Sequence, residues 1–297
     1  MQYQISSSMA SFCKTMPLPQ AMRMIKDAGF DALDFPFSVY AYGENAPLLQ
    51  ADWRDWVRQV RDLSRELSLP IAQAHAAWEQ GIGERFRYEP PHELYERTLE
   101  ACGMVGCGHL IFHPLRRPDR VDTESLRGRI HDYNVRWFHS LVPAAQENKV
   151  TIDLENTFDS HHTQLPGDLP YPYVTAQDML SLQRDIASPY VKLCLDTGHA
   201  NISAQDIPAM IYTFGRELST LHLNDNYGHI GPIYEDLHLF PGSGKIEWEP
   251  IFTALRSVGY CGVLNIEPVA ELRRASNRVR AILLRAAADT LRAMLEG

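Results

Sequence analysis

The chain has 297 residues, of which 45% are hydrophobic and 22% charged, a composition that predicts a globular fold with a sizeable core. No apolar run approaches the roughly 20 residues that a membrane-spanning helix needs, and the N-terminal segment lacks the features of a secretory signal. We therefore expect a cytoplasmic protein. The formal net charge of −9 argues against a broad electrostatic surface for nucleic acid or anionic lipid.

Short apolar runs rich in β-branched residues alternate with helical patterns along the whole chain. The clearest predicted helices are Pro19–Ala28, Asp52–Leu67, Glu249–Val258 and Arg273–Glu296, and the first of them opens with a proline and stops before a glycine. The predicted strands, in chain order, are Gln4–Met9, Ala32–Phe35, Ile71–His75, His109–His113, Val150–Glu155, Val191–Asp196, Leu218–His222 and Gly262–Glu267.

Eight strands that alternate with helices predict the α/β class and one (β/α)8 TIM barrel that occupies residues 1–297 as a single domain. An open doubly wound sheet is the main alternative, but it would normally carry a glycine fingerprint after a strand. The Gly242-Ser243-Gly244 segment follows a loop and predicts a turn rather than a phosphate-binding loop.

Most of the predicted strands end in a residue that can bind a metal ion. In a barrel these ends meet at one mouth, where the active sites of this fold lie. Carboxylates and imidazoles together suit Mn, Co, Zn or Mg. Taken singly, each histidine could be a hydrogen-bonded core residue and each glutamate a solvated strand end, but the shared chemistry favours a metal site. The residues concerned are His75, His113, Glu155, Asp196, His222 and Glu267, with His199 just after strand six and Asp236 and His238 in the loop after strand seven.

Four segments resemble the xylose isomerase-like barrel superfamily, which contains sugar isomerases and epimerases, inosose dehydratases and zinc-dependent AP endonucleases. They are residues 152–156 (IDLEN), 195–201 (LDTGHAN), 221–225 (LHLND) and 236–246 (DLHLFPGSGKI). In the ketose 3-epimerase branch the resemblance implies one metal ion held by the counterparts of Glu155, Asp196, His222 and Glu267. The counterpart of His199 contacts the substrate there.

The endonuclease branch implies a different metal count, because it binds three zinc ions with nine ligands. Every one of those ligands has a counterpart in this chain, so the ligands alone do not separate the two branches. We expect one divalent ion and keep up to three open. The nine residues are His75, His113, Glu155, Asp196, His199, His222, Asp236, His238 and Glu267.

Other features favour sugar chemistry over DNA binding. The segment after Glu155 continues into an insertion rich in proline and tyrosine, whereas the endonucleases carry a glycine-rich segment there. The chain has only five lysines, and no basic and aromatic stripe follows a duplex. One departure counts against the epimerases: the arginine that they place after the strand-seven histidine has no counterpart in Asn224–Tyr234.

Loop residues above the mouth are candidates for substrate binding. Trp78 belongs to a set of aromatic side chains that either form a lid over a sugar or pack loops together. Arg116 either binds a phosphate or carboxylate group or is a solvated surface residue. The remaining lid candidates are Tyr40, Tyr42, Phe86, Tyr88, Tyr171 and Tyr173.

The sequence thus predicts a divalent-metal-dependent isomerase or epimerase of a ketose-like sugar or sugar phosphate. Glu155 and Glu267 are the expected catalytic residues, which move a proton next to a carbonyl while the metal stabilises an enediolate. Asn224 or Asp225 is expected to orient His222. An AP endonuclease-like phosphodiesterase with a multinuclear zinc site and a non-catalytic, metal-dependent sugar-binding protein are the alternatives. The expected partner is a small-molecule sugar, with nucleic acid and membranes unexpected and a homo-oligomer left open.

Overall fold

The computed structural model describes residues 3–77, 92–114, 124–158, 171–228 and 236–296. Its strands form one parallel, eight-stranded sheet in the order β7-β6-β5-β4-β3-β2-β1-β8. The sheet curls into a barrel, and the backbone N–H of Leu223 donates to the carbonyl oxygen of Asn265 at 2.7 Å where β7 meets β8. The strands are β1 (Ile5–Ser8), β2 (Ala32–Phe35), β3 (Ile71–His75), β4 (His109–Phe112), β5 (Thr151–Glu155), β6 (Val191–Asp196), β7 (Leu218–His222) and β8 (Leu264–Ile266).

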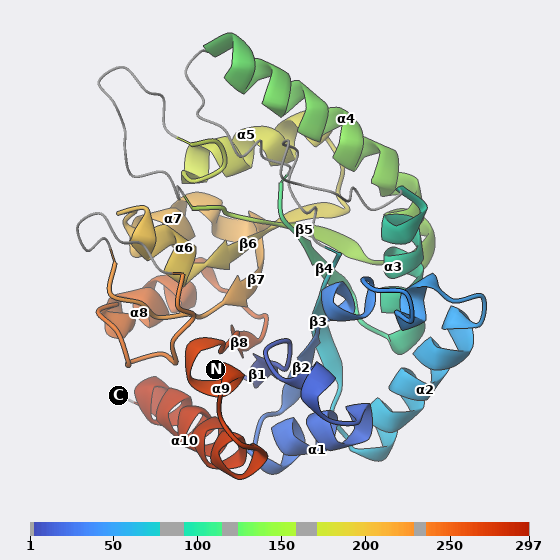
Figure 1. Ribbon diagram of the computed structural model, residues 1–297. Helices are drawn as coiled ribbons and strands as arrows, with labels where there is room; N and C mark the ends of the chain where they lie inside the picture. The colour runs from blue at the N-terminus through green and yellow to red at the C-terminus, as the bar shows by residue number, and fades with distance from the viewer. Residues whose placement is uncertain (1–2, 78–91, 115–123, 159–170, 229–235, 297) are drawn as a thin grey trace.

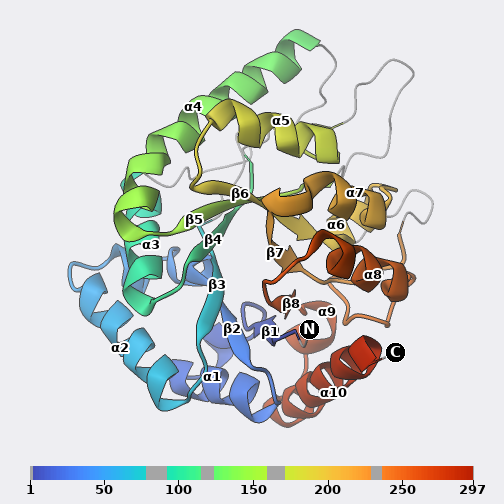
Figure 2. The same ribbon diagram turned by 180° about the vertical axis from the view of Figure 1, so that it is seen from behind.

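Helices form an outer ring around these strands, as the views from the two ends of the barrel show (Figures 1 and 2). The last helix packs against the first, so the ring closes where β1 pairs with β8. The predicted single-domain TIM barrel is therefore confirmed. The helices are α1 (Leu18–Asp27), α2 (Trp53–Glu66), α3 (His92–Val105), α4 (Glu124–Asn148), α5 (Ala176–Ile186), α6 (Thr197–Ile202), α7 (Ile207–Phe214), α8 (Trp248–Val258), α9 (Ala270–Arg273) and α10 (Asn277–Glu296).

Each helix covers the barrel with its apolar side. On α2 the buried side chains Trp53, Val57 and Val60 recur at helical spacing, so one stripe of the helix faces the strands. Helix α5 begins where the Thr175 hydroxyl accepts a hydrogen bond from the backbone N–H of Asp178. Among the described residues, no helix combines the length and apolar character needed to cross a membrane.

The helix predicted over Arg273–Glu296 forms as α10, but it begins at Asn277, four residues later than predicted. The chain forms the short helix α9, leaves helical geometry and restarts as α10 at Asn277. The buried side chain of Arg280 accounts for the break, because its Nε donates to the carbonyl oxygen of Leu272 at 2.9 Å. That bond satisfies a carbonyl at the end of α9 that an unbroken helix would have satisfied internally.

Candidate metal centre

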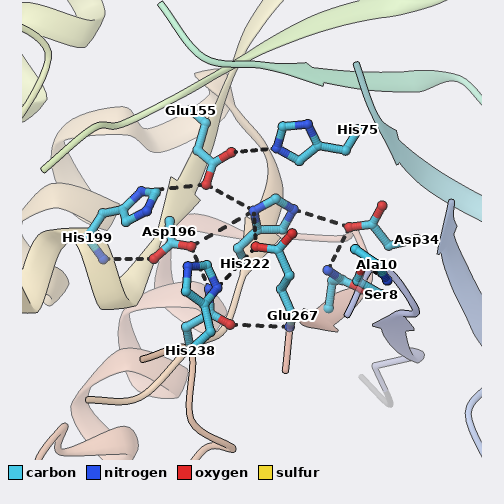
Figure 3. A network of polar contacts seen from close by, with 12 residues as sticks. Ser8, Ala10, Asp34, His75, Glu155, Asp196, His199, His222, His238 and Glu267 are labelled. Atoms are coloured by element: carbon cyan, nitrogen blue, oxygen red, sulfur yellow. Dashed lines mark hydrogen bonds and ion pairs between the residues drawn. The ribbon is translucent and has the colours of Figure 1, made fainter. Parts of the chain in front are cut away.

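Histidine and carboxylate side chains converge at the carboxyl ends of the strands (Figure 3). They do so because each is the last residue of a parallel strand or lies in the loop or short helix that follows it, and parallel strand ends share one rim of the barrel. All nine residues singled out in the sequence lie within one network of contacts. It contains His75, His113, Glu155, Asp196, His199, His222, Asp236, His238 and Glu267.

His222 lies at the middle of this network. Its Nδ1 is 3.0 Å from Glu155 Oε1, 3.7 Å from Glu267 Oε2 and 3.9 Å from Asp196 Oδ2. The four side chains come from β5, β6, β7 and the residue after β8, and all four are buried. Three carboxylate oxygens thus face a single imidazole nitrogen, away from solvent.

Two further groups flank this central set. On one side, His75 Nε2 and His113 Nε2 lie 3.3 Å and 3.1 Å from Glu155 Oε2. The two imidazole nitrogens are themselves 3.2 Å apart. Glu155 therefore presents one oxygen to His222 and the other to this histidine pair.

On the other side, a carboxylate lies between two histidines. Asp236 Oδ2 is 2.8 Å from His238 Nε2 and 3.4 Å from His199 Nε2. His238 Nδ1 is 3.2 Å from Glu267 Oε2, so this group is joined to the central set. His238 has a φ of +47°, a backbone conformation that costs free energy for a residue other than glycine. Such strain is common where a side chain must be aimed into a site.

Asp196 is fixed by the start of the next helix. Its Oδ1 accepts a hydrogen bond from the backbone N–H of His199 at 2.8 Å, which caps α6, and its Oδ2 accepts one from Asn224 Nδ2 at 2.6 Å. The side chain of Asn156 pairs with the backbone of Asp196 on both sides, at 2.7 Å and 3.1 Å. A Cβ added at Gly198 would lie 3.1 Å from Asp196 Oδ1, which explains the small residue in this turn.

Charge compensation sets the protonation of the glutamates. Burial alone would raise the pKa of Glu155, but the neighbouring charges of His222 and His113 hold that pKa well below its ordinary value. Burial is likewise outweighed at Glu267, where His222 and His238 lower the pKa to about 2. Both side chains are therefore carboxylates near neutral pH.

The pKa values of the histidines shift in two directions. Burial disfavours the charged imidazole of His222, but Glu155 and Glu267 raise its pKa well above the ordinary value. At His113 burial prevails and the pKa is lowered. Without a metal ion the centre balances its carboxylate charge with protons on some of its imidazoles.

The donor set fits a divalent cation. Ligand atoms of His75, His222 and Glu267 lie within 4.8 Å of one another, and so do those of His75, His113 and Glu155. Asp236 Oδ1 is a buried oxygen that accepts no hydrogen bond from the described residues. Buried carboxylate oxygens are costly unless they are compensated, and carboxylate with imidazole suits Mn, Co, Zn or Mg.

The side chain that contacts the outer nitrogen of His222 is Asp34 on β2, which the sequence analysis missed. The distance from Asp34 Oδ2 to His222 Nε2 is 3.2 Å (Figure 3). The signal in the sequence was a carboxylate inside an otherwise apolar strand, since buried charges need a partner. It could not be matched to His222 from spacing, because the two positions are 188 residues apart.

The expectation that Asn224 or Asp225 orients His222 was wrong. The Asn224 side chain bonds to Asp196 and to the backbone N–H of Glu267. Asp225 accepts hydrogen bonds from the backbone of residues 226, 242 and 246 and from Trp248 Nε1, so it fixes the loop after β7.

The residues predicted to bind substrate lie in different environments or outside the described residues. Trp78 and Arg116 lie outside the described residues, as do Phe86 and Tyr88. Tyr40 is buried and stacks on Phe35 at 5.7 Å between ring centroids, and the hydroxyl of buried Tyr173 accepts a hydrogen bond from Asn134. For these two tyrosines the packing alternative holds. His199 stays a substrate candidate, with the Phe158 ring 4.9 Å from its own.

The chain thus has the architecture of a TIM barrel with a candidate metal centre at its histidine–carboxylate mouth. The chain belongs to the xylose isomerase-like TIM barrel family, whose model matches residues 22–293. It is 29% identical over 167 residues to D-psicose 3-epimerase of Enterocloster bolteae, a match to 56% of this chain and 48% of that protein.

A second relative and one solved structure are also similar to this chain. The chain is 27% identical over 179 residues to D-psicose 3-epimerase of Agrobacterium fabrum, a match to 59% of this chain and 55% of that protein. The match therefore spans about half the length of these curated relatives. The structure of a D-tagatose 3-epimerase-like protein superposes with a TM-score of 0.74, at 21% identity, and covers 99% of this chain and 97% of the other. That likeness establishes the fold alone.

Proposed function

We propose that the chain is a divalent-metal-dependent isomerase or epimerase that acts on a ketose-like sugar or sugar phosphate. The observation that carries the proposal is the convergence of Glu155, Asp196 and Glu267 on the Nδ1 atom of His222. Relatives named as D-psicose 3-epimerases support the substrate class.

Glu155, Asp196, His222 and Glu267 would hold one ion in this proposal. When bound, a divalent ion supplies Lewis acidity that polarises the carbonyl of the substrate. Two of these residues have a second task. Glu155 is the last residue of β5 and Glu267 follows β8, so they approach the space beside His222 from different strands.

Proton transfer belongs to the two glutamates. Isomerisation or epimerisation breaks the C–H bond next to the carbonyl, transfers its proton to one carboxylate and returns a proton from the other side. The low pKa values of Glu155 and Glu267 keep both groups deprotonated, as a proton acceptor must be. His199 would hydrogen-bond a substrate oxygen through Nε2, which also lies 3.4 Å from Asp236 Oδ2, while its Nδ1 contacts the backbone carbonyl of Asn156 at 2.8 Å.

A phosphodiesterase with several zinc ions is the second candidate function. The specific observation in its favour is that His75, His113, Asp236 and His238 join the same network. A metal count separates the two candidates, since the first requires one ion per chain and the second requires three.

The test combines a metal count with an exchange experiment. Protein prepared without chelator should contain one Mn, Co or Mg ion per chain by elemental analysis. Incubated in heavy water with ketoses, ketose phosphates and keto-inositols, it should place deuterium next to the carbonyl of at least one compound, or convert it to an epimer. Three zinc ions per chain, no exchange or product with any compound, and cleavage of DNA at abasic sites would reject the proposal.

A further inference from the structure

Asp34 is a fully buried carboxylate in the barrel interior. It is the third residue of β2 and lies beside Ser8 of β1 and Gln73 of β3 in the sheet register. Its exposed fraction is 0%, although it belongs to no part of the central ligand set. A buried carboxylate of this kind is costly unless several donors compensate it.

Three donors from three strands meet one oxygen of Asp34. Asn265 Nδ2 on β8 donates to Oδ2 at 3.0 Å, and Gln73 Nε2 on β3 donates to it at 3.2 Å. His222 Nε2 on β7 is the third contact, at 3.2 Å. Because Oδ2 already accepts two amide N–H groups, it acts as an acceptor, and the proton in the third contact belongs to His222 Nε2.

The position of that proton decides what the other imidazole nitrogen can do. A neutral His222 with its proton on Nε2 has its lone pair on Nδ1, the nitrogen that faces Glu155, Asp196 and Glu267. Within the described residues, the side chain of Asp34 reaches the central set through His222 alone (Figure 3).

We infer that Asp34 is the positioning residue of the centre: it fixes the Nε2–H tautomer of His222 and aims Nδ1 at the ion. The inference rests on the proposed function, because it assigns Asp34 a role toward the metal. Outer carboxylates of this kind orient ligating histidines, and their loss typically costs about 10- to 100-fold in metal affinity.

The amide and alanine variants of Asp34 separate this role from simple packing. Asp34→Asn keeps an acceptor oxygen and removes the charge, and we expect it to weaken Mn²⁺ binding about 10-fold. Asp34→Ala removes the acceptor, and we expect a loss of about 100-fold, with the number of ions per chain unchanged in both. Titration of metal-free protein with Mn²⁺, followed by electron paramagnetic resonance of the free ion, measures the affinity without any substrate.

The matched control is Asp153→Asn. Asp153 is also a fully buried strand aspartate with two side-chain partners, His109 and Ser219, but it does not contact the central set. Its variant should keep the Mn²⁺ affinity within about twofold of the parent value even if the protein is less stable. Equal losses for the Asp153 and Asp34 variants would reduce Asp34 to a packing role and overturn the inference.

A spectroscopic test of the inference does not require the protein to bind a metal ion. In metal-free protein, where Nδ1 of His222 can carry a proton as well, we expect a slowly exchanging, downfield Nε2 proton, assigned to His222 by its absence in His222→Gln and to Nε2 by its ¹⁵N correlation. It should shift upfield in Asp34→Asn, which also serves if the alanine variant does not fold. An unchanged resonance in Asp34→Asn would overturn the inference. Failure of the parent protein to bind any divalent ion would instead reject the proposed function.

Discussion

The two ends of the barrel treat their buried carboxylates differently, and β5 carries one of each kind. Asp153 and Glu155 are two residues apart, so they point to the same side of the strand, and both are buried. Toward the amino end, Asp153 has one partner for each oxygen: Ser219 Oγ at 2.6 Å and His109 Nδ1 at 2.9 Å. Its hydrogen bonding is matched one to one.

At the carboxyl end of the barrel, the carboxylate oxygens do not have one partner each. Glu155 shares His222 with two other carboxylates and shares its second oxygen between His75 and His113. A matched pair stabilises the barrel, whereas a surplus of ligand atoms around a common point is suited to binding a cation. The comparison agrees with the general division of this fold into a stabilising amino end and a chemical carboxyl end.

The largest expected effect comes from the glutamates at the carboxyl end. Glu155→Gln and Glu267→Gln should each reduce turnover by about 10³-fold, because each loses a charged ligand and a proton carrier. The metal-free variants should also unfold at a lower temperature than the parent, because each lost carboxylate leaves neighbouring protonated imidazoles uncompensated. Steady-state kinetics and thermal denaturation check the two statements.

Asp153→Asn should affect stability without affecting turnover. It should retain turnover and lower the free energy of unfolding by about 1–3 kcal/mol, because a matched buried hydrogen-bond partner is altered. Normal turnover in a folded glutamate variant, or a lost turnover in Asp153→Asn, would break the comparison between the two ends.

The histidine pair beside Glu155 should give a smaller effect. If one ion binds, His75→Ala and His113→Ala should change kcat/KM by about 10-fold while the ion stays bound, since these imidazoles only flank the central set. If three ions bind, each variant should lower the metal count per chain. Elemental analysis beside kinetics decides, and an unchanged count of three zinc ions in both variants would contradict the trinuclear assignment.

The smallest expected effect is a change of stability with pH, which arises from the His109–Asp153 pair at the amino end of the barrel. Burial opposes the charged form of His109, but the Asp153 carboxylate raises its pKa to about 9. Stability from a raised histidine pKa is fully present below its unfolded value of about 6.5 and is lost as the pH rises through about 9.

Because the His109 side chain is 38% exposed, solvent screening reduces this contribution. We expect the free energy of unfolding to fall by about 1–2 kcal/mol between about pH 6 and pH 9.5. His109→Gln should remove that part of the pH dependence in urea denaturation. The same slope in parent and variant would show that the pair does not contribute.

The sequence predicted the strands better than the contacts between them. Ala32–Phe35, Ile71–His75, Val191–Asp196 and Leu218–His222 have the predicted bounds, because apolar runs buried on both sides stand out between polar loops. The nine ligand-type residues were found because each is tied to a strand end or to the loop after strand seven. Their roles in binding and catalysis stay predictions.

What the sequence could not supply were pairings between distant strands. The Asp34–His222 contact depends on barrel closure, which brings β2 and β7 to the same interior layer. The break between α9 and α10 depends on where the Arg280 side chain is buried. Both features depend on tertiary contacts, which local sequence patterns do not predict.

The cap of α6 has a consequence for how the candidate centre would bind an ion. The hydrogen bonds that hold Asp196 to His199 and Asn224 immobilise the carboxylate in the metal-free protein. Ordering a free side chain on binding costs about 0.5–1.5 kcal/mol. The Asp196 side chain is already ordered in the folded protein. Asp196 is thus preorganised, and position 196 serves helix and centre together. Under the proposed function, a substitution there would change the local fold and the metal affinity together.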